Sequence, residues 1–267
     1  MLKSSNLQFL NLFAVKKPIK VSFRNLSKNT VRSSIAAQHY LDKESEYGAH
    51  NYKPIPVVIS KGKGCKVWDV EGKVYYDCLS GYSALNQGEY AEYLTNLFGY
   101  QKMMPMNSGV EAVDTAVKLA RKWAYEVKGV PQNKAKIIFA KDNFHGRSLF
   151  ACSASTDPEV YQNFGPFLPN IFHVPFDDLE ALELALSDPN CAAFVVEPIQ
   201  GEAGVVIPSS DYLKGVRELC TKNKVLMIAD EVQTGLGRTG KPDIITLGKA
   251  LSGGFYPISA VLSDNEI

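Results

Sequence analysis

Asp243-Ile-Ile-Thr-Leu-Gly-Lys-Ala-Leu-Ser-Gly-Gly254 places one lysine, Lys249, directly after a short apolar run rich in β-branched residues. Such a run is typical of a buried strand, so Lys249 is predicted at the exit of a strand, among small residues. Upstream, residues 225–229 have the same character and end in Asp230 and Glu231. Strand exits of an open α/β sheet meet in the crevice where ligands bind, which predicts that Lys249 and Asp230 share one site.

A lysine and an aspartate in this arrangement suit pyridoxal 5'-phosphate (PLP). The lysine amine forms a Schiff base with the cofactor, and the aspartate pairs with the pyridinium nitrogen. The alternative interpretation is two solvated charges at strand ends. These residues alone favour neither interpretation, because spacing without geometry does not define a site.

Positive charge is concentrated at the start of the chain. The net charge of the whole chain is +1. Residues 1–34 nevertheless contain seven cations, several serines and no acid, and the first acid in the chain is Asp42. The cations are Lys3, Lys16, Lys17, Lys20, Arg24, Lys28 and Arg32. A basic, serine-rich, acid-free segment is typical of a mitochondrial transit peptide, which predicts the matrix as the location. A disordered basic tail is the alternative.

The overall composition excludes several classes of protein. Apolar residues make up 45% of the chain and charged residues 21%, as in ordinary globular proteins. No apolar run reaches the length of a membrane span, and no basic stripe for nucleic acid follows the first 34 residues. The sequence also lacks the H-E-x-x-H pattern of a zinc site and the G-x-S-x-G turn of a hydrolase.

Hydrophobic patterning divides the remainder into a small part, residues 35–88, and a large part, residues 89–267. The small part contains strand-like runs at 57–60, 65–70 and 74–79, separated by glycine turns, which predicts an antiparallel meander. In the large part, strands at 136–140, 192–196 and 225–229 alternate with helices at 109–127, 178–186 and 210–223. This alternation predicts an α/β fold with a mostly parallel sheet, covered by helices on both faces.

The helix predicted from Gly109 begins with Ser108 and has Glu111 in its first turn, the pattern of a capping box. The box is a sufficient structural explanation of these residues. The functional alternative is a phosphate held by the Ser108 hydroxyl and the free N–H groups of Gly109 and Val110.

Two further strand exits carry polar or aromatic residues. Asn143-Phe-His-Gly-Arg147 follows the strand that ends at residue 140, where Phe144 could stack on a planar ring and Arg147 could hold a carboxylate. Glu197 directly follows the strand at 192–196. A core phenylalanine, a surface arginine and a solvated acid are the alternatives. Together with Asp230, the three exits predict a single site.

Gly235-Leu-Gly-Arg-Thr-Gly-Lys241 matches the glycine patterns of both dinucleotide-binding and P-loop motifs. Both motifs require that the glycines open a helix. Here Pro242 and a strand follow, so a nucleotide site is not predicted and the segment is interpreted as a glycine-rich loop.

Five motifs in order resemble those of the class III (ω-) aminotransferases of PLP fold type I: Ser108-Gly109, Phe144–Arg147, Glu197–Glu202, Asp230–Gln233 and Lys249. The resemblance covers residues 36–267. Tyr47–Pro56 and Ser80–Gly88 are similar to the ornithine-type branch of the class. The resemblance implies a large domain with a mostly parallel sheet, a small antiparallel N-terminal domain, and a homo-oligomer, dimeric or higher.

The resemblance also implies a role for each cofactor-binding residue. Lys249 would form the Schiff base and shuttle the proton, and Asp230 would keep the ring nitrogen protonated. Phe144 and Val232 would enclose the ring, Gln233 would contact its phenolic oxygen, and Glu197 would lie in the same site. Ser108, Gly109 and Val110 would hold the phosphate.

For the substrates, Tyr52 and Tyr82 would contact L-ornithine, and Arg147 the α-carboxylate of 2-oxoglutarate. Glu202 would pair with an arginine of a C-terminal domain. The implied reaction moves the δ-amino group of ornithine to 2-oxoglutarate and gives glutamate-5-semialdehyde and glutamate. The alternatives are another ω-aminotransferase, acting on acetylornithine or 4-aminobutyrate, and a catalytically weak member that serves as a binding or dimer partner.

Compared with that family, the chain is expected to be shortened after Gly88, after Gly240 and at its C-terminal end. The second loss leaves only residues 231–242 between two predicted parallel strands, close to the minimum for a crossover. The position of Lys249 relative to Asp230 is therefore expected to be disturbed.

Overall fold

The computed structural model describes residues 35–49, 56–77, 87–235, 242–253 and 257–267, all within one compact unit, Ser33–Ile267. The predicted transit peptide and two predicted substrate residues, Tyr52 and Tyr82, lie outside the described residues. No described helix is long and apolar enough to cross a membrane.

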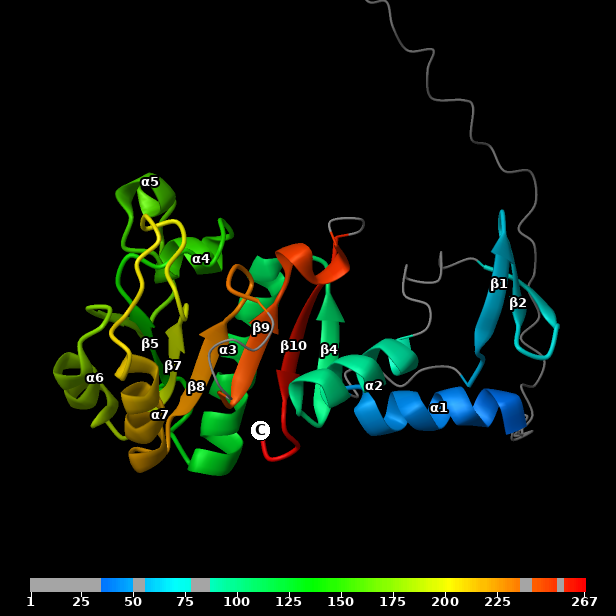
Figure 1. The fold of residues 1–267 in the computed structure, drawn as a ribbon, viewed down its shortest axis with the longest axis horizontal. Helices are drawn as coiled ribbons and strands as arrows, with labels where there is room; N and C mark the ends of the chain where they lie inside the picture. The colour runs from blue at the N-terminus through cyan, green and yellow to red at the C-terminus, as the bar shows by residue number, and fades with distance from the viewer. Residues whose placement is uncertain (1–34, 50–55, 78–86, 236–241, 254–256) are drawn as a thin grey trace, which may run out of the picture. The chain divides into compact units, whose positions relative to one another are not determined.

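A seven-stranded sheet forms the main body of the fold (Figure 1). Its strands, in spatial order, are β4 (Lys102–Met106), β10 (Ser259–Ser263), β9 (Ile244–Leu247), β8 (Leu226–Asp230), β7 (Cys191–Val196), β5 (Lys136–Ala140) and β6 (Ile171–Val174). Strand β10 is antiparallel to both of its neighbours, and the pairs from β9 to β6 are all parallel. The predicted α/β fold with a mostly parallel sheet is confirmed.

Helices cover both faces of this sheet, as the alternation of side chains along its strands shows. In β7, Ala193 and Val195 pack into a core shared with α3 (Gly109–Trp123), whereas Phe194 and Val196 pack into a second core. The second core is shared with α6 (Leu179–Leu186) and α7 (Tyr212–Lys222). The chain also forms α4 (Leu149–Ala154), α5 (Pro158–Tyr161) and a 3-10 turn at Lys249–Ser252. Because successive side chains of a strand face opposite sides, each apolar strand serves two cores.

The helix predicted over 109–127 is α-helical to Trp123 and continues as a π-helical turn, Ala124–Lys128. Of the apolar positions at helical spacing, the structure buries Val113, Val117, Ala120 and Ala124 and leaves Val110 half-buried. Gly129 ends the segment in the left-handed region, with φ 81°. The periodicity therefore placed the helix correctly, and the departure is limited to its last turns.

The small antiparallel meander predicted near the N-terminus is also present. Its strands are β1 (Ile59–Lys63), β2 (Lys66–Asp69) and β3 (Val74–Tyr76), paired in that order. The Asp69 carboxylate accepts hydrogen bonds from the N–H groups of Glu71 and Lys73 and from the Tyr75 hydroxyl. This side chain therefore organises the turn between β2 and β3.

Two N-terminal helices, α1 (Ile35–Tyr47) and α2 (Gln87–Phe98), pack on each other and on β4. A third apolar core joins Ala91 and Leu94 of α2 to buried residues of β9 and β10. The boundary predicted between residues 88 and 89 falls in the first turn of α2.

The short connection between β8 and β9 does not disturb their pairing. The two strands form a parallel ladder in which Ile228 is opposite Ile244 and Asp230 is opposite Thr246. At the start of the strands, the Asp243 carboxylate accepts a 2.7 Å hydrogen bond from Met227 N. It also accepts one of 2.6 Å from Arg217 Nη1 of α7. The parallel pairing of β8 and β9 is therefore intact despite the short connection.

We predict that Asp243→Ala destabilises the fold by about 2–3 kcal/mol, because it leaves the Met227 N–H without its acceptor and the Arg217 guanidinium without its partner. Asp243→Asn keeps an acceptor for Met227 and is expected to cost about 1 kcal/mol. Urea unfolding followed by circular dichroism measures both. Equal stability of the alanine variant and the parent would show that this carboxylate does not hold the strand starts together.

Candidate active site

Four strand exits of the parallel part of the sheet carry the predicted site residues. Asp230 is the last residue of β8, and Glu197 directly follows β7. Lys249 follows β9 after one glycine, and the segment containing Phe144 follows β5. Because these strands are parallel, their exits lie along the same edge of the sheet.

Asp230 is the most completely held of these side chains, and it is only 5% exposed. Its Oδ1 accepts hydrogen bonds from Val232 N (3.1 Å) and from Thr246 Oγ1 (3.0 Å). Its Oδ2 lies 2.6 Å from Nδ1 of His145. When the carboxylate is ionised it can only accept, and Nδ1 is then the donor of this pair. A carboxylate has about four acceptor positions, and these bonds use three of them.

His145 is a member of this network that the sequence motifs did not single out. Its side chain is fully buried beneath the site, and its ring centroid lies 5.5 Å from that of Phe139. Burial alone would lower the pKa of His145, but the hydrogen bond to Asp230 and the negative charges of Asp230 and Glu197 outweigh it and raise the pKa. A histidine within a strand-exit segment that already carries candidate residues was the signal available in the sequence.

Glu197 lies beside this pair and is also buried. Its Oε2 accepts a 3.0 Å hydrogen bond from Phe144 N, which ties the β7 exit to the segment after β5. Burial raises the pKa of Glu197 to about 7, even though the neighbouring His145 acts to lower it. The site therefore contains two carboxylates and an imidazole, with Glu197 titrating close to neutral pH.

The start of α3 forms the predicted capping box. Ser108 Oγ accepts a hydrogen bond from Glu111 N (3.4 Å), and Glu111 Oε2 accepts one from Ser108 N (2.9 Å). The box leaves the Ser108 hydroxyl proton available for donation. Helical geometry gives the N–H groups of Gly109 and Val110 no partner within the helix. The structural and the anion-binding interpretations of this segment are therefore compatible.

Close contacts bring the start of α3 against the strand exits. A Cβ on Gly109 would lie 2.8 Å from Val232 Cγ1, and a Cβ on Gly248 would lie 3.2 Å from the same atom. A Cβ on Gly146 would lie 2.6 Å from the Cβ of Val110. Segments far apart in the sequence thus meet at Gly109 and Gly146 at distances too short for an added Cβ, and at Gly248 at a distance that leaves it little room.

The remaining predicted residues lie around this centre. Phe144 is half-buried, and the exposed Arg147 guanidinium carbon is 5.9 Å from the centroid of its ring. Gln233 Nε2 donates a 3.1 Å hydrogen bond to Glu202 Oε1, so these two predicted residues contact each other. Lys249 is exposed and has a left-handed backbone, with φ 43°. Such a conformation costs a non-glycine residue roughly 1 kcal/mol and is common at functional sites.

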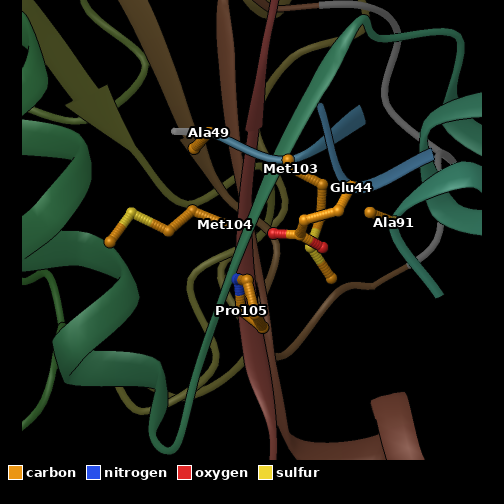
Figure 2. Close-up of a pocket in the computed structure, with 7 residues that line it drawn as sticks. Glu44, Ala49, Ala91, Met103, Met104 and Pro105 are labelled. Carbon is orange, nitrogen blue, oxygen red and sulfur yellow. The ribbon is translucent and has the colours of Figure 1, made fainter. Parts of the chain in front are cut away.

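Two hollows elsewhere on the chain contain none of the predicted site residues. One, with a volume of about 10 Å³, is lined by Glu44, Ala91, Met103 and neighbouring residues, where α1 and α2 meet β4 (Figure 2). It has room for about one water molecule. The other is an open groove of about 320 Å³ between α6 and α7, lined by Leu179, Leu219 and several charged residues.

The family profile described as Aminotransferase class-III matches residues 47–90 and 87–267. This chain belongs to the class-III aminotransferases. Among curated class-III relatives, the mitochondrial ornithine aminotransferase of Rattus norvegicus is 52% identical over 281 residues, covering 90% of this chain and 64% of the relative. The probable mitochondrial ornithine aminotransferase of Caenorhabditis elegans is 53% identical over 274 residues, covering 88% and 65%.

Solved structures of aminotransferases are also similar to this chain. The ornithine aminotransferase of Toxoplasma gondii superimposes with a TM-score of 0.65 and 44% identity, covering 86% of this chain and 64% of that one. The acetylornithine aminotransferase of Elizabethkingia anophelis superimposes with a TM-score of 0.57 and 50% identity, covering 86% and 66%. The chain thus spans roughly two thirds of the length of these class-III aminotransferases.

We predict that Glu197→Gln makes the stability of the fold less dependent on pH. With a folded pKa of about 7 against an ordinary value of 4.5, the protonated form of Glu197 adds stability that is fully present below pH 4.5 and is lost as the pH rises to 7. The parent should therefore lose on the order of 3 kcal/mol more than the glutamine variant between pH 4.5 and pH 8.

Denaturant unfolding at both pH values measures this difference. Glu180→Gln, a change to a carboxylate of α6 outside the strand-exit network, serves as the control and should follow the parent. Parallel stability curves for the parent and Glu197→Gln would contradict the buried, nearly neutral titration of Glu197.

Proposed function

We propose that this chain is a PLP-dependent aminotransferase of the ornithine type, moving the δ-amino group of L-ornithine to 2-oxoglutarate to give glutamate-5-semialdehyde and glutamate. The observation that carries the proposal is the buried carboxylate of Asp230, held at a strand exit by three hydrogen bonds, with Lys249 at the neighbouring exit. The names of curated relatives that are 52–53% identical to this chain support the choice of substrate.

The residues present fit the chemical groups of PLP. The cofactor needs an anion for its ring nitrogen, an amine for its carbonyl carbon and donors for its phosphate. Asp230 has an acceptor position left on Oδ2, Lys249 is accessible, and the start of α3 offers the Ser108 hydroxyl and helix-end N–H groups. A solved Toxoplasma gondii ornithine aminotransferase is described with partial occupancy of PLP at its active site.

When bound, PLP would accept the amino group and spread the negative charge that develops as the substrate loses a proton. In this proposal Lys249 Nζ removes that proton, and Asp230 keeps the ring nitrogen protonated. Phe144 and Val232 enclose the ring, and Gln233 contacts its phenolic oxygen. Ser108, Gly109 and Val110 hold the phosphate, and Glu197 completes the buried part of the site.

For the substrates, the proposal assigns Tyr52 and Tyr82 to ornithine and Arg147 to the α-carboxylate of 2-oxoglutarate. The exposed guanidinium of Arg147 supports this role, because a planar fork matches a carboxylate. Glu202 would control which substrate is accepted. In this chain its carboxylate accepts a hydrogen bond from Gln233 at Oε1, which links Glu202 to a residue assigned to the cofactor.

The proposed location is the mitochondrial matrix, with residues 1–34 as the transit peptide and a homo-oligomer, dimeric or higher, as the assembly. Animal relatives are named mitochondrial, whereas the Plasmodium falciparum relative, 52% identical over 277 residues, is named without a location. The basic, acid-free composition of the first 34 residues supports import. In the proposed division, residues 35–88 belong to the small domain and 89–267 to the large one.

A second candidate is a member of the family that binds the cofactor but turns over weakly, acting as a partner subunit. Another ω-aminotransferase activity is favoured by the 50% identity to the Elizabethkingia acetylornithine enzyme.

We predict that borohydride reduction after incubation with PLP labels Lys249, because its exposed amine stands at the β9 exit beside the other site residues. Peptide mass mapping locates the label. Lys249→Ala should abolish it, and Lys214→Ala, which removes an exposed lysine of α7, should not. A label at another lysine, or none in folded protein, would overturn the proposed function.

The visible absorbance of the PLP complex then distinguishes the substrates. Ornithine should shift the band at lower concentration than acetylornithine or 4-aminobutyrate. A coloured complex that no amine shifts would favour the weak partner subunit, and a preference for another amine would replace ornithine in the proposal.

A further inference from the structure

The His145 imidazole stands out because neither its packing nor its hydrogen bonding accounts for it as a structural residue alone. It lies against the apolar ring of Phe139, at a centroid distance of 5.5 Å, and its side chain is fully buried. Its Nε2 is buried without a hydrogen-bond partner among the described residues. A buried polar atom left unpaired costs stability, so an apolar ring would serve packing better.

The polar contact that His145 does make is with Asp230. Two donors, Val232 N and Thr246 Oγ1, both bond Oδ1, and the two oxygens of the carboxylate move together when it rotates about the Cβ–Cγ bond. The 2.6 Å contact from His145 Nδ1 holds the carboxylate at its other oxygen, Oδ2, and so restrains the same rotation from the opposite side. One acceptor position on Oδ2 remains after this bond.

The negative charges around the imidazole favour its protonated form. Asp230 and Glu197 are the carboxylates that raise the pKa of His145, against the effect of its burial. A donor to a carboxylate that is 5% exposed also offsets the cost of keeping that carboxylate ionised away from water. His145 therefore supplies Asp230 with a donor that is both buried and favourably charged.

We propose that His145 is a positioning residue for the cofactor: by donating from Nδ1 to Asp230 Oδ2, it holds that carboxylate oriented to accept a hydrogen bond from the protonated ring nitrogen of PLP. This inference rests on the proposed function. The His145 side chain links the segment after β5 to the end of β8. The proposal assigns it no contact with the cofactor or with the substrate.

Two amide substitutions test the role because they differ in where they place a donor. The Asn side-chain nitrogen falls near the position of Nδ1, and the Gln nitrogen near that of Nε2. His145→Asn should keep the bond to Asp230 and bind PLP within about twofold of the parent, whereas His145→Gln should weaken binding about tenfold. His173→Gln is the matched control, since His173 also packs on Phe139 but bonds to Ala154 O, and it should bind PLP like the parent.

Absorbance titration with PLP gives the dissociation constants. The pH dependence of the bound cofactor's spectrum gives the protonation of its ring nitrogen, which a merely structural role would not change. In His145→Gln this proton should be lost at lower pH than in the parent, and His145→Asn should restore the parent profile. Circular dichroism confirms that each variant is folded.

The ¹⁵N–¹H NMR spectrum of the cofactor-free parent provides a further measurement, independent of the stability of any variant. It should contain a slowly exchanging Nδ1–H signal from His145 at low field. Absence of that signal, or PLP binding and spectra unchanged in His145→Gln, would overturn the positioning role alone. Failure of the parent itself to bind PLP would overturn the proposed function and this inference with it.

Discussion

The hydrogen bonds of the buried Asp230 carboxylate are the interaction on which the rest of the site depends. They join the end of β8 to Thr246 of β9 and to His145 in the segment after β5, so one side chain ties three strand exits together. A carboxylate taken out of water must find donors, and the backbone and side chains around it supply three. This requirement couples the stability of the sheet edge to the chemistry proposed for it.

The sheet meets this requirement through its parallel register. Ladder pairs place Asp230 beside Thr246, and the Asp243 carboxylate holds the starts of the same two strands through Met227 N and Arg217. Contacts at both ends of β8 and β9 explain why a short connection is compatible with parallel pairing. Glycines at the start of α3 and after β9 then let Val232 pack between these segments.

Much of this fold could be predicted because apolar periodicity reports burial directly. The strand at 136–140 coincides with β5, and the helix from Gly109 follows its buried alanines and valines. Strand β4 escaped prediction because Lys102–Met106 has no clear alternation and contains Pro105, which only an edge strand tolerates. Strand β10 was missed because its two end residues, Ser259 and Ser263, are buried serines, which leaves an apolar run of only Ala260–Leu262.

The sequence alone determined which kinds of residue stand at the strand exits: the acids Glu197 and Asp230, the lysine at 249 and the serine that opens α3. Only the tertiary structure decided which of them touch. It brought His145 to Asp230 across 85 residues of chain and placed Gln233 against Glu202. The physical reason is that burial follows local periodicity, whereas a hydrogen bond depends on a separation of about 3 Å that only sheet register and packing can set.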